Sequence, residues 1–168
     1  VLNATISLYC HATLRAKNTT DITIESLDLG ETAKFDNIDN FLSISDNFDL
    51  FRSIIRLLKP SFGFHLLVNS DFPMGSGLGG SSSVITAVLG CFNELRSDKW
   101  GDHELAEMAF QAERINMGVS GGWQDQYATV FGGFNFMEFK NTHNLISPLR
   151  LSEKTTLELQ ENLVLFSV

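Results

Sequence analysis

Apolar and polar residues alternate over the first 36 positions of the chain, as they do in half-buried β-strands. β-Branched and aromatic residues are frequent here, and Asn, Asp and Gly, which favour turns, separate the runs. The pattern predicts strands in ATISLYCHATLRA (residues 4–16), DITIES (21–26) and ETAKFD (31–36). Because these runs follow one another closely, we expect them to pair as antiparallel hairpins.

The apolar period becomes helical after residue 46. FDLFRSIIRLLK (48–59) is predicted to be a helix that Asp46 or Asn47 caps and Pro60 ends. A second helix, over about 81–96, is predicted by an apolar stripe of Val84, Val88, Cys91 and Leu95. The other predicted elements are a strand in FGFHLLVNS (62–70), a helix from Asp102 to about Asn116, a short helix in QDQYATVF (124–131), a strand in GGFNFMEF (132–139) and two strand-like runs in 149–168.

Composition indicates a folded chain of about one domain, with 168 residues of which 43% are apolar. The net charge of −8 argues against a nucleic-acid partner, because such surfaces are usually basic. No apolar run approaches the roughly 18 residues that a membrane-spanning helix needs. Cys10 and Cys91 stand apart among apolar neighbours, which predicts two small buried side chains and neither a metal site nor a disulfide.

Both ends of the sequence lie inside element-like patterns. The chain begins without Met in an alternating run and stops in the apolar run NLVLFSV. We therefore expect the sequence to be cut at both ends.

The stretch between the predicted strand 62–70 and the helix after it is dominated by glycine and serine. Eight of the nine residues from Gly75 to Ser83 are Gly or Ser. A strand, a glycine-rich loop and a helix form an anion site, because free N–H groups of the loop and of the first helical turn converge there. The alternative interpretation is a tight turn that only reverses the chain.

Two known phosphate loops fit poorly. A Walker A loop needs a lysine at the position of Ser81. Gly75, Gly77 and Gly80 match the G-x-G-x-x-G pattern of dinucleotide-binding folds, and Glu94, Asp98 and Asp102 follow where a ribose-binding carboxylate would be sought. Such a fold, however, should open with a βαβ unit, whereas this chain opens with a β-rich block.

Two carboxylates are candidates for completing a triphosphate site. A phosphate loop without lysine in an acidic protein favours Mg²⁺, which is typically held by one or two carboxylates together with phosphate oxygens. Glu113 falls at the edge of the apolar stripe of its predicted helix, while Glu104 and Glu107 fall on the outer face. Asp125 follows a Gly-Gly turn. The plainer roles are an edge ion pair for Glu113 and a helix cap for Asp125.

The segment PMGSGLGGSSS resembles the P-x-x-x-G-L-G-S-S-A motif of the GHMP kinases, the superfamily of galactokinase, homoserine kinase and mevalonate kinase. Pro73, Gly77, Leu78, Gly79 and Ser81 stand in motif positions, and Gly80 departs by replacing the first serine. AFQAER, SGGWQDQYA and FGGF follow in the order and at the separations of the family's later motifs. Within the family, SGGWQDQYATVFGGFNFMEF together with GSGLGGSSS…GCFNEL resembles most closely the D-glycero-D-manno-heptose 7-phosphate kinases, with fucokinase-related sugar kinases close behind.

The resemblance implies residue roles. ATP would bind at Pro73, Gly75, Ser76, Gly77, Leu78, Gly79, Gly80, Ser81 and Ser82. Ser81 and Glu113 would hold Mg²⁺, and Asp125 would orient the acceptor hydroxyl and accept its proton. Substrate contacts would come from Gly121, Gly122, Gln124 and Asp125, whereas Trp123 would either touch the sugar or pack.

The resemblance also implies an α+β fold. Residues 1–140 would form the GHMP N-terminal domain, similar to domain 2 of ribosomal protein S5, and 141–168 would begin a ferredoxin-like C-terminal domain. The implied activity is phosphoryl transfer from ATP to a small sugar, most closely the anomeric hydroxyl of heptose 7-phosphate, in the cytoplasm. A fucokinase-like activity, an NAD-binding oxidoreductase and a non-catalytic sugar- or nucleotide-binding protein stay open as alternatives.

Overall fold

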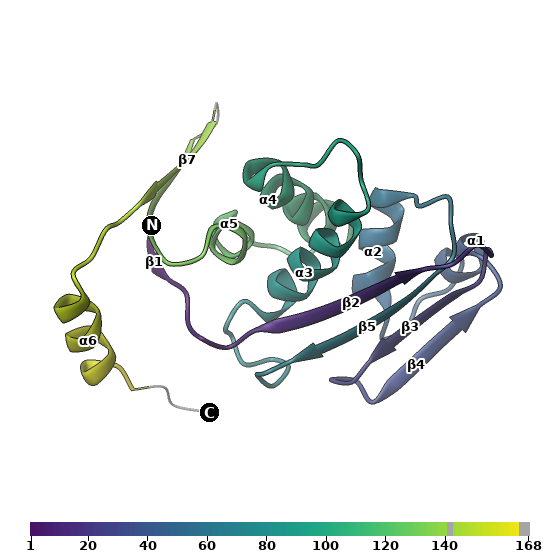
Figure 1. The fold of residues 1–168 in the computed structure, drawn as a ribbon, viewed down its shortest axis with the longest axis horizontal. Coiled ribbons are helices and arrows are strands. Elements are labelled where there is room, and N and C mark those ends of the chain that lie inside the picture. Colours follow the sequence, from purple (N-terminus) through teal and green to yellow (C-terminus); the bar gives the residue numbers. More distant parts are fainter. Residues whose placement is uncertain (141–142, 165–168) are drawn as a thin grey trace.

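A computed structural model describes residues 1–140 and 143–164, and its α+β fold is built on two sheets (Figure 1). The larger sheet has the strand order β2 (Cys10–Ala16), β5 (Phe64–Ser70), β3 (Ile22–Ser26) and β4 (Glu31–Phe35). The smaller sheet has the order β1 (Leu2–Ala4), β6 (Phe134–Lys140) and β7 (His143–Pro148). The predicted α+β class is therefore confirmed.

Strand pairing differs from the predicted series of hairpins. β3 and β4 form the expected antiparallel hairpin, but β5 lies between β2 and β3 and pairs with β3 in parallel. The predicted strand 4–16 is also divided, since β1 pairs with β6 and β2 with β5. Alternation along a strand identifies its buried face but not the strand with which it pairs. Here the partners β6 of β1 and β5 of β2 both lie far away in sequence.

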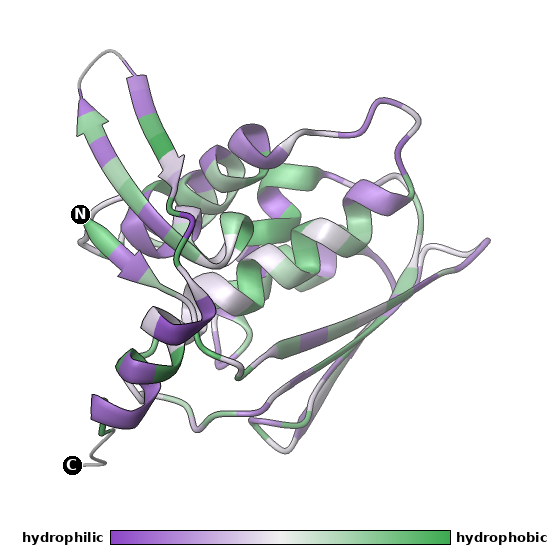
Figure 2. Cartoon of the chain, turned by 60° about the vertical axis from the view of Figure 1, so that its left-hand side comes forward, coloured by the Kyte–Doolittle hydropathy of each residue, from purple (hydrophilic) through white to green (hydrophobic). Residues whose placement is uncertain are grey.

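A layer of helices lies over one face of the larger sheet (Figures 1 and 2). The helices of the described chain are α1 (Ile38–Leu42), α2 (Asp49–Leu58), α3 (Gly80–Glu94), α4 (Asp102–Phe110), a π-helical turn η1 (Gln111–Asn116), α5 (Gln124–Phe131) and α6 (Glu153–Asn162). Of these, α6 lies apart from that layer (Figure 1). In α3 the predicted stripe is rotated, because Leu95 is exposed and the fully buried positions are Ile85, Val88, Leu89 and Phe92. These residues belong to the main core cluster, and α3 lies against β2, while the Phe92 ring meets that of Phe64 in β5 edge to face at 5.3 Å.

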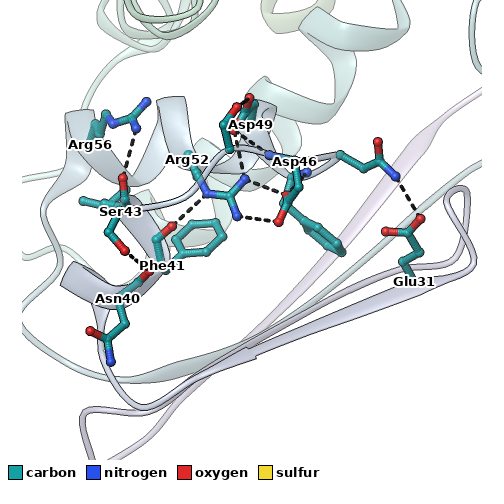
Figure 3. A network of polar contacts seen from close by, with 12 residues as sticks. Glu31, Asn40, Phe41, Ser43, Asp46, Asp49, Arg52 and Arg56 are labelled. Carbon is teal, nitrogen blue, oxygen red and sulfur yellow. Dashed lines mark hydrogen bonds and ion pairs between the residues drawn. The ribbon is translucent and has the colours of Figure 1, made fainter.

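A buried arginine joins α2 to the segment before it (Figure 3). Arg52 is fully buried and donates to Asp46 at 2.6 and 2.9 Å, to Asp49 at 2.9 Å and to the Phe41 carbonyl at 2.8 Å. Its hydrogen bonds lower the pKa of Asp46. Asp46 accepts the N–H of Phe48 rather than capping the helix as predicted, and α2 begins at Asp49 without a side-chain cap. Asp46 thus completes a charge cluster.

The C-terminal segment corrects a second prediction. Instead of two strand-like runs in 149–168, the chain forms α6, of which no residue is buried. Ser152 caps this helix by accepting the N–H of Thr155 at 3.1 Å, a local start signal that the strand prediction did not take into account. The end of the second run, 165–168, lies outside the described residues. The hairpin of β6 and β7 crosses residue 140, where the domain boundary was predicted, and that boundary stays a prediction.

Tyr127 anchors the smaller core cluster that lies beside the smaller sheet. Its hydroxyl donates to Glu107 at 2.6 Å and accepts from Asn144 at 3.1 Å, so Glu107 is not on a solvated outer face as predicted. Burial, together with the hydrogen bond to Glu107, raises the pKa of Tyr127 to about 12. The network ties α4, α5 and β7 together. Within the described residues, none of the helices combines the length and apolar character needed to cross a membrane.

Replacing Tyr127 by Phe is expected to lower the free energy of unfolding by about 1 kcal/mol near neutral pH, because a buried hydrogen bond is lost. The wild-type advantage should shrink as the pH rises from 10 to about 12, since the unfolded tyrosine releases its proton before the folded one does. Urea denaturation across this pH range measures both effects. Tyr9→Phe, at a 59% exposed tyrosine, is the control, and equal pH dependence of the two variants would contradict the network's role.

Candidate active site

The glycine-rich loop leads from the end of β5 into the first turn of α3. Gly77 and Gly79 have left-handed backbone conformations, with φ of 72° and 73°, which other residues adopt only with strain. The first hydrogen bond within the helix runs from the Ser83 N–H to the Gly79 carbonyl at 3.0 Å, so the N–H groups before it are left for another partner. Loop and helix together present the N–H groups of an anion site.

Gly80, where the sequence departs from the motif serine, has a steric explanation. A Cβ at this position would lie 2.9 Å from Cε2 of Phe72, whose ring is buried beside the loop. Phe72 therefore leaves room for glycine and not for a serine side chain without a shift of the ring.

Glu113 is buried at the wider π-helical turn η1, with 4% of its surface exposed. One carboxylate oxygen, Oε2, accepts from Ser82 Oγ at 2.6 Å and from Gln126 Nε2 at 2.5 Å. The helical period placed Glu113 at the edge of an apolar stripe, but a π turn changes the direction in which the following residues face. The structure thus places Ser82 of α3 against Glu113, while Ser81 is exposed.

Asp125 lies in the first turn of α5 and close to the loop. A Cβ on Gly79 would be 4.0 Å from the Asp125 Cβ. Arg114 connects the two candidate carboxylates, since its Nη2 lies 3.5 Å from Asp125 Oδ2 and its Nη1 lies 3.8 Å from Glu113 Oε1. Asp125 makes no side-chain cap to α5, so the plainer role considered for it is absent from the described contacts.

A cleft of about 780 Å³ brings the loop and α5 together. Its lining includes residues 1–10 together with Gly77, Leu78, Gly79, Gln124 and Asp125. None of the lining residues is a Lys or Arg. A small anionic molecule in this cleft would therefore be held by backbone N–H groups and would lie next to the Asp125 carboxylate.

The other candidate residues are placed less centrally. Pro73, Gly75, Ser76, Ser81, Gly121 and Gly122 are not among the residues that line the cleft. Gly121 instead lies against the Arg114 guanidinium, where a Cβ would come within 2.6 Å of Cζ. Trp123 stacks on Phe110 with a ring separation of 3.4 Å, which favours the packing role.

Gln126 and Arg114 are the residues that sequence reasoning missed. Gln126 is fully buried and donates to both Ser82 and Glu113. The only sequence signal for it was its position between Asp125 and Tyr127. For Arg114 the only sequence signal was its position directly after Glu113.

The donor set at this point suits Mg²⁺, which prefers carboxylate and hydroxyl oxygens and relies on substrate phosphates for its remaining ligands. The Glu113 carboxylate and serine hydroxyls at the start of α3 are of this kind. The described residues contain no cluster of three or more His, Cys, Asp and Glu that could hold a metal by itself. Any Mg²⁺ bound here would therefore take some of its ligands from a bound phosphate.

Comparison with protein families matches residues 49–133 to the GHMP kinases N terminal domain. A D-glycero-alpha-D-manno-heptose 7-phosphate kinase of Campylobacter jejuni is 41% identical over 172 residues, which cover 99% of this chain and 50% of that protein. An L-fucokinase/L-fucose-1-P guanylyltransferase of Bacteroides fragilis is 26% identical, with 70% of this chain and 14% of that protein covered.

A solved structure agrees with this match. The D-glycero-D-manno-heptose 1-phosphate kinase of Bacteroides thetaiotaomicron superposes with a TM-score of 0.83 at 34% identity, covering 95% of this chain and 54% of that one. The chain thus spans about half the length of the heptose phosphate kinases that it matches.

Proposed function

Because the chain belongs to the GHMP kinase family, we propose that the protein transfers the γ-phosphoryl group of ATP to a hydroxyl of a small sugar. The acceptor that we propose is the anomeric hydroxyl of D-glycero-D-manno-heptose 7-phosphate. The observation that carries the proposal is the position of Asp125, which lines one cleft together with the Gly77–Gly79 loop. We place the reaction in the cytoplasm as part of the same proposal.

The loop and the start of α3 bind the triphosphate in this proposal. Their N–H groups replace the lysine that other phosphate loops use, and the helix dipole favours the negative charge. Ser81 and Glu113 hold Mg²⁺, with Ser82 and Gln126 fixing the Glu113 carboxylate. When bound, the metal supplies positive charge that lowers the cost of bringing an acceptor hydroxyl to the phosphates.

Asp125 orients the acceptor hydroxyl and accepts its proton during the attack on phosphorus. Phosphoryl transfer depends mainly on positioning and charge stabilisation, so a carboxylate at the acceptor is the chief chemical group that the protein must supply. Gln124, which also lines the cleft, and the Gly121–Gly122 turn are the proposed neighbours of the sugar.

The names of the relatives support a heptose phosphate over other acceptors. The two relatives at 34% and 41% identity are named as heptose phosphate kinases, whereas the fucokinase relative is 26% identical. The dinucleotide alternative fits poorly, because β3 and β5 are the one parallel pair among the described strands rather than part of a doubly wound sheet.

Release of ADP by the full-length protein tests the proposal. Mg·ATP is supplied with heptose 7-phosphate, heptose 1-phosphate, L-fucose, galactose or no acceptor. The two heptose monophosphates are both needed, because the names of the relatives place the phosphate on different carbons. Turnover with heptose 7-phosphate alone is expected. Turnover with L-fucose alone would show that the proposed acceptor is wrong and that L-fucose takes its place. Folded protein that binds Mg·ATP without any turnover would favour the binding-protein alternative.

Replacing Glu113 by Gln is expected to raise the Mg²⁺ concentration needed for half-maximal activity by about tenfold or more, because an amide is a weaker metal ligand than a carboxylate. A Mg²⁺ titration of the initial rate measures the change. Glu94→Gln is the matched control, since Glu94 is exposed and pairs only with Lys99 among the described contacts. If Glu113→Gln needs the same Mg²⁺ concentration as wild type, Glu113 is not a metal ligand and its role is structural.

A further inference from the structure

Arg114 is a nearly buried arginine whose bonding capacity is largely unused. Its side chain is 11% exposed, and its one hydrogen bond among the described contacts is a long one of 3.4 Å from Nη1 to the Ser120 carbonyl. The Nε atom is buried without a partner among the described residues. A guanidinium carries five N–H donors and is costly to bury unless they are paired.

Arg52 shows that a buried arginine in this protein can have its donors well paired, unlike Arg114. Arg52 makes four hydrogen bonds of 2.6–2.9 Å. Arg114 instead lies 3.5 Å from Asp125 and 3.8 Å from Glu113, longer than the usual 2.7–2.9 Å of charge-assisted hydrogen bonds. Arg114 is therefore close to both carboxylates but not saturated by them.

The local structure holds the guanidinium at this place. Arg114 lies on the π turn η1, directly after Glu113, and Gly121 packs against its guanidinium so closely that a Cβ there would fall within 2.6–2.9 Å of three of its atoms. Arg114 does not line the cleft itself, but it lies 3.5 Å from Asp125, which does. Arg114 is thus the cation beside Asp125 and Glu113 in the described part of the chain.

We propose that Arg114 is a positioning residue for phosphoryl transfer, which lies between the two carboxylates and orients Asp125 toward the cleft. The inference rests on the proposed kinase function. In the step concerned, the acceptor oxygen forms a bond to the γ-phosphorus and the bond from that phosphorus to the β,γ-bridging oxygen breaks. ADP leaves with the electron pair, and the acceptor proton passes to Asp125. Arg114 takes no part in these bond changes and acts through the carboxylate that it orients.

The test compares Arg114→Ala, Arg114→Lys and wild type in the full-length enzyme, with the acceptor that wild type uses best. Arg114→Ala is expected to lower kcat by about 10²-fold, the lower end of the usual contribution of the base that Arg114 orients, with the KM for ATP changed by less than about threefold. Guanidinium chloride at millimolar, non-denaturing concentration should restore part of the kcat of Arg114→Ala and leave wild type unchanged. Arg114→Lys should fall between the two, because it keeps the charge but loses the planar fork.

Arg96→Ala is the matched control, because Arg96 pairs with Asp98 on the surface and should change kcat by no more than about twofold. A kcat within threefold of wild type for both Arg114→Lys and Arg114→Ala would overturn the inference. So would a loss of kcat that guanidinium does not restore and that accompanies a loss of thermal stability. If Arg114→Ala fails to fold, the kcat and KM of Arg114→Lys decide. Wild type without turnover on any acceptor would instead refute the proposed function, so the two failures are distinguishable.

Discussion

Replacing Asp125 by Asn is expected to lower kcat by about 10²- to 10⁴-fold, the usual contribution of general acid–base catalysis, while ATP affinity stays within a few-fold. Asn is nearly isosteric with Asp but cannot accept the acceptor proton. Among the described contacts, the Asp125 side chain interacts with Arg114 and not with the phosphate loop, so binding of the nucleotide should survive the change.

Initial rates with Mg·ATP and the sugar, together with direct titration of Mg·ATP binding, separate these two effects. Asp98→Asn is the control, because it removes the same charge at an exposed surface position, with 79% of the side chain accessible. Turnover by Asp125→Asn close to that of wild type would refute the assignment of Asp125. A variant that lost ATP binding as strongly as turnover would place Asp125 in nucleotide binding instead.

Replacing Arg52 by Met is expected to lower the free energy of unfolding by about 3 kcal/mol, near the lower end of the range for breaking a buried ion pair. The change removes the hydrogen bonds that the fully buried Arg52 side chain donates to Asp46, Asp49 and the Phe41 carbonyl. It also removes the cation from the Phe41 ring, 4.6 Å away. The carboxylates of Asp46 and Asp49 are 41% and 42% exposed, so water relieves part of the cost.

Urea denaturation of the full-length protein measures this loss, and Arg56→Met is the matched control one turn further along α2 (Figure 3). Arg56 is exposed and reaches only the Leu42 carbonyl, at 3.2 Å. We expect its replacement to cost less than about 1 kcal/mol. Equal losses for the two variants would contradict a structural role for the buried cluster.

Much of the fold was predictable because local patterns carry it. The helix in 48–59, the strand in 62–70 and the helix from Asp102 to Asn116 each have a clear period and a recognisable stop, and the structure has elements there. The loop was predictable too, since left-handed backbone conformations at Gly77 and Gly79 explain why glycine recurs.

The features that sequence reasoning missed depend on distant parts of the chain or on local geometry that no period reveals. The pairing of β2 with β5 joins residues more than 45 positions apart, and no pattern within β2 specifies this partner. The π turn at η1 turns Glu113 toward Ser82 and Gln126, a result that a regular helical wheel cannot give. Arg114 becomes visible as a site residue only when its distances to both carboxylates are known.

Phosphorus NMR of the sugar product formed by the full-length protein from Mg·ATP and heptose 7-phosphate tests the central claim most directly. The account predicts one new phosphomonoester signal, coupled to the anomeric proton, beside the unchanged signal of the phosphate at C7, and one ADP per new sugar phosphate. ATP converted to ADP and free phosphate without a new sugar phosphate, or a new phosphate at another carbon, would contradict it.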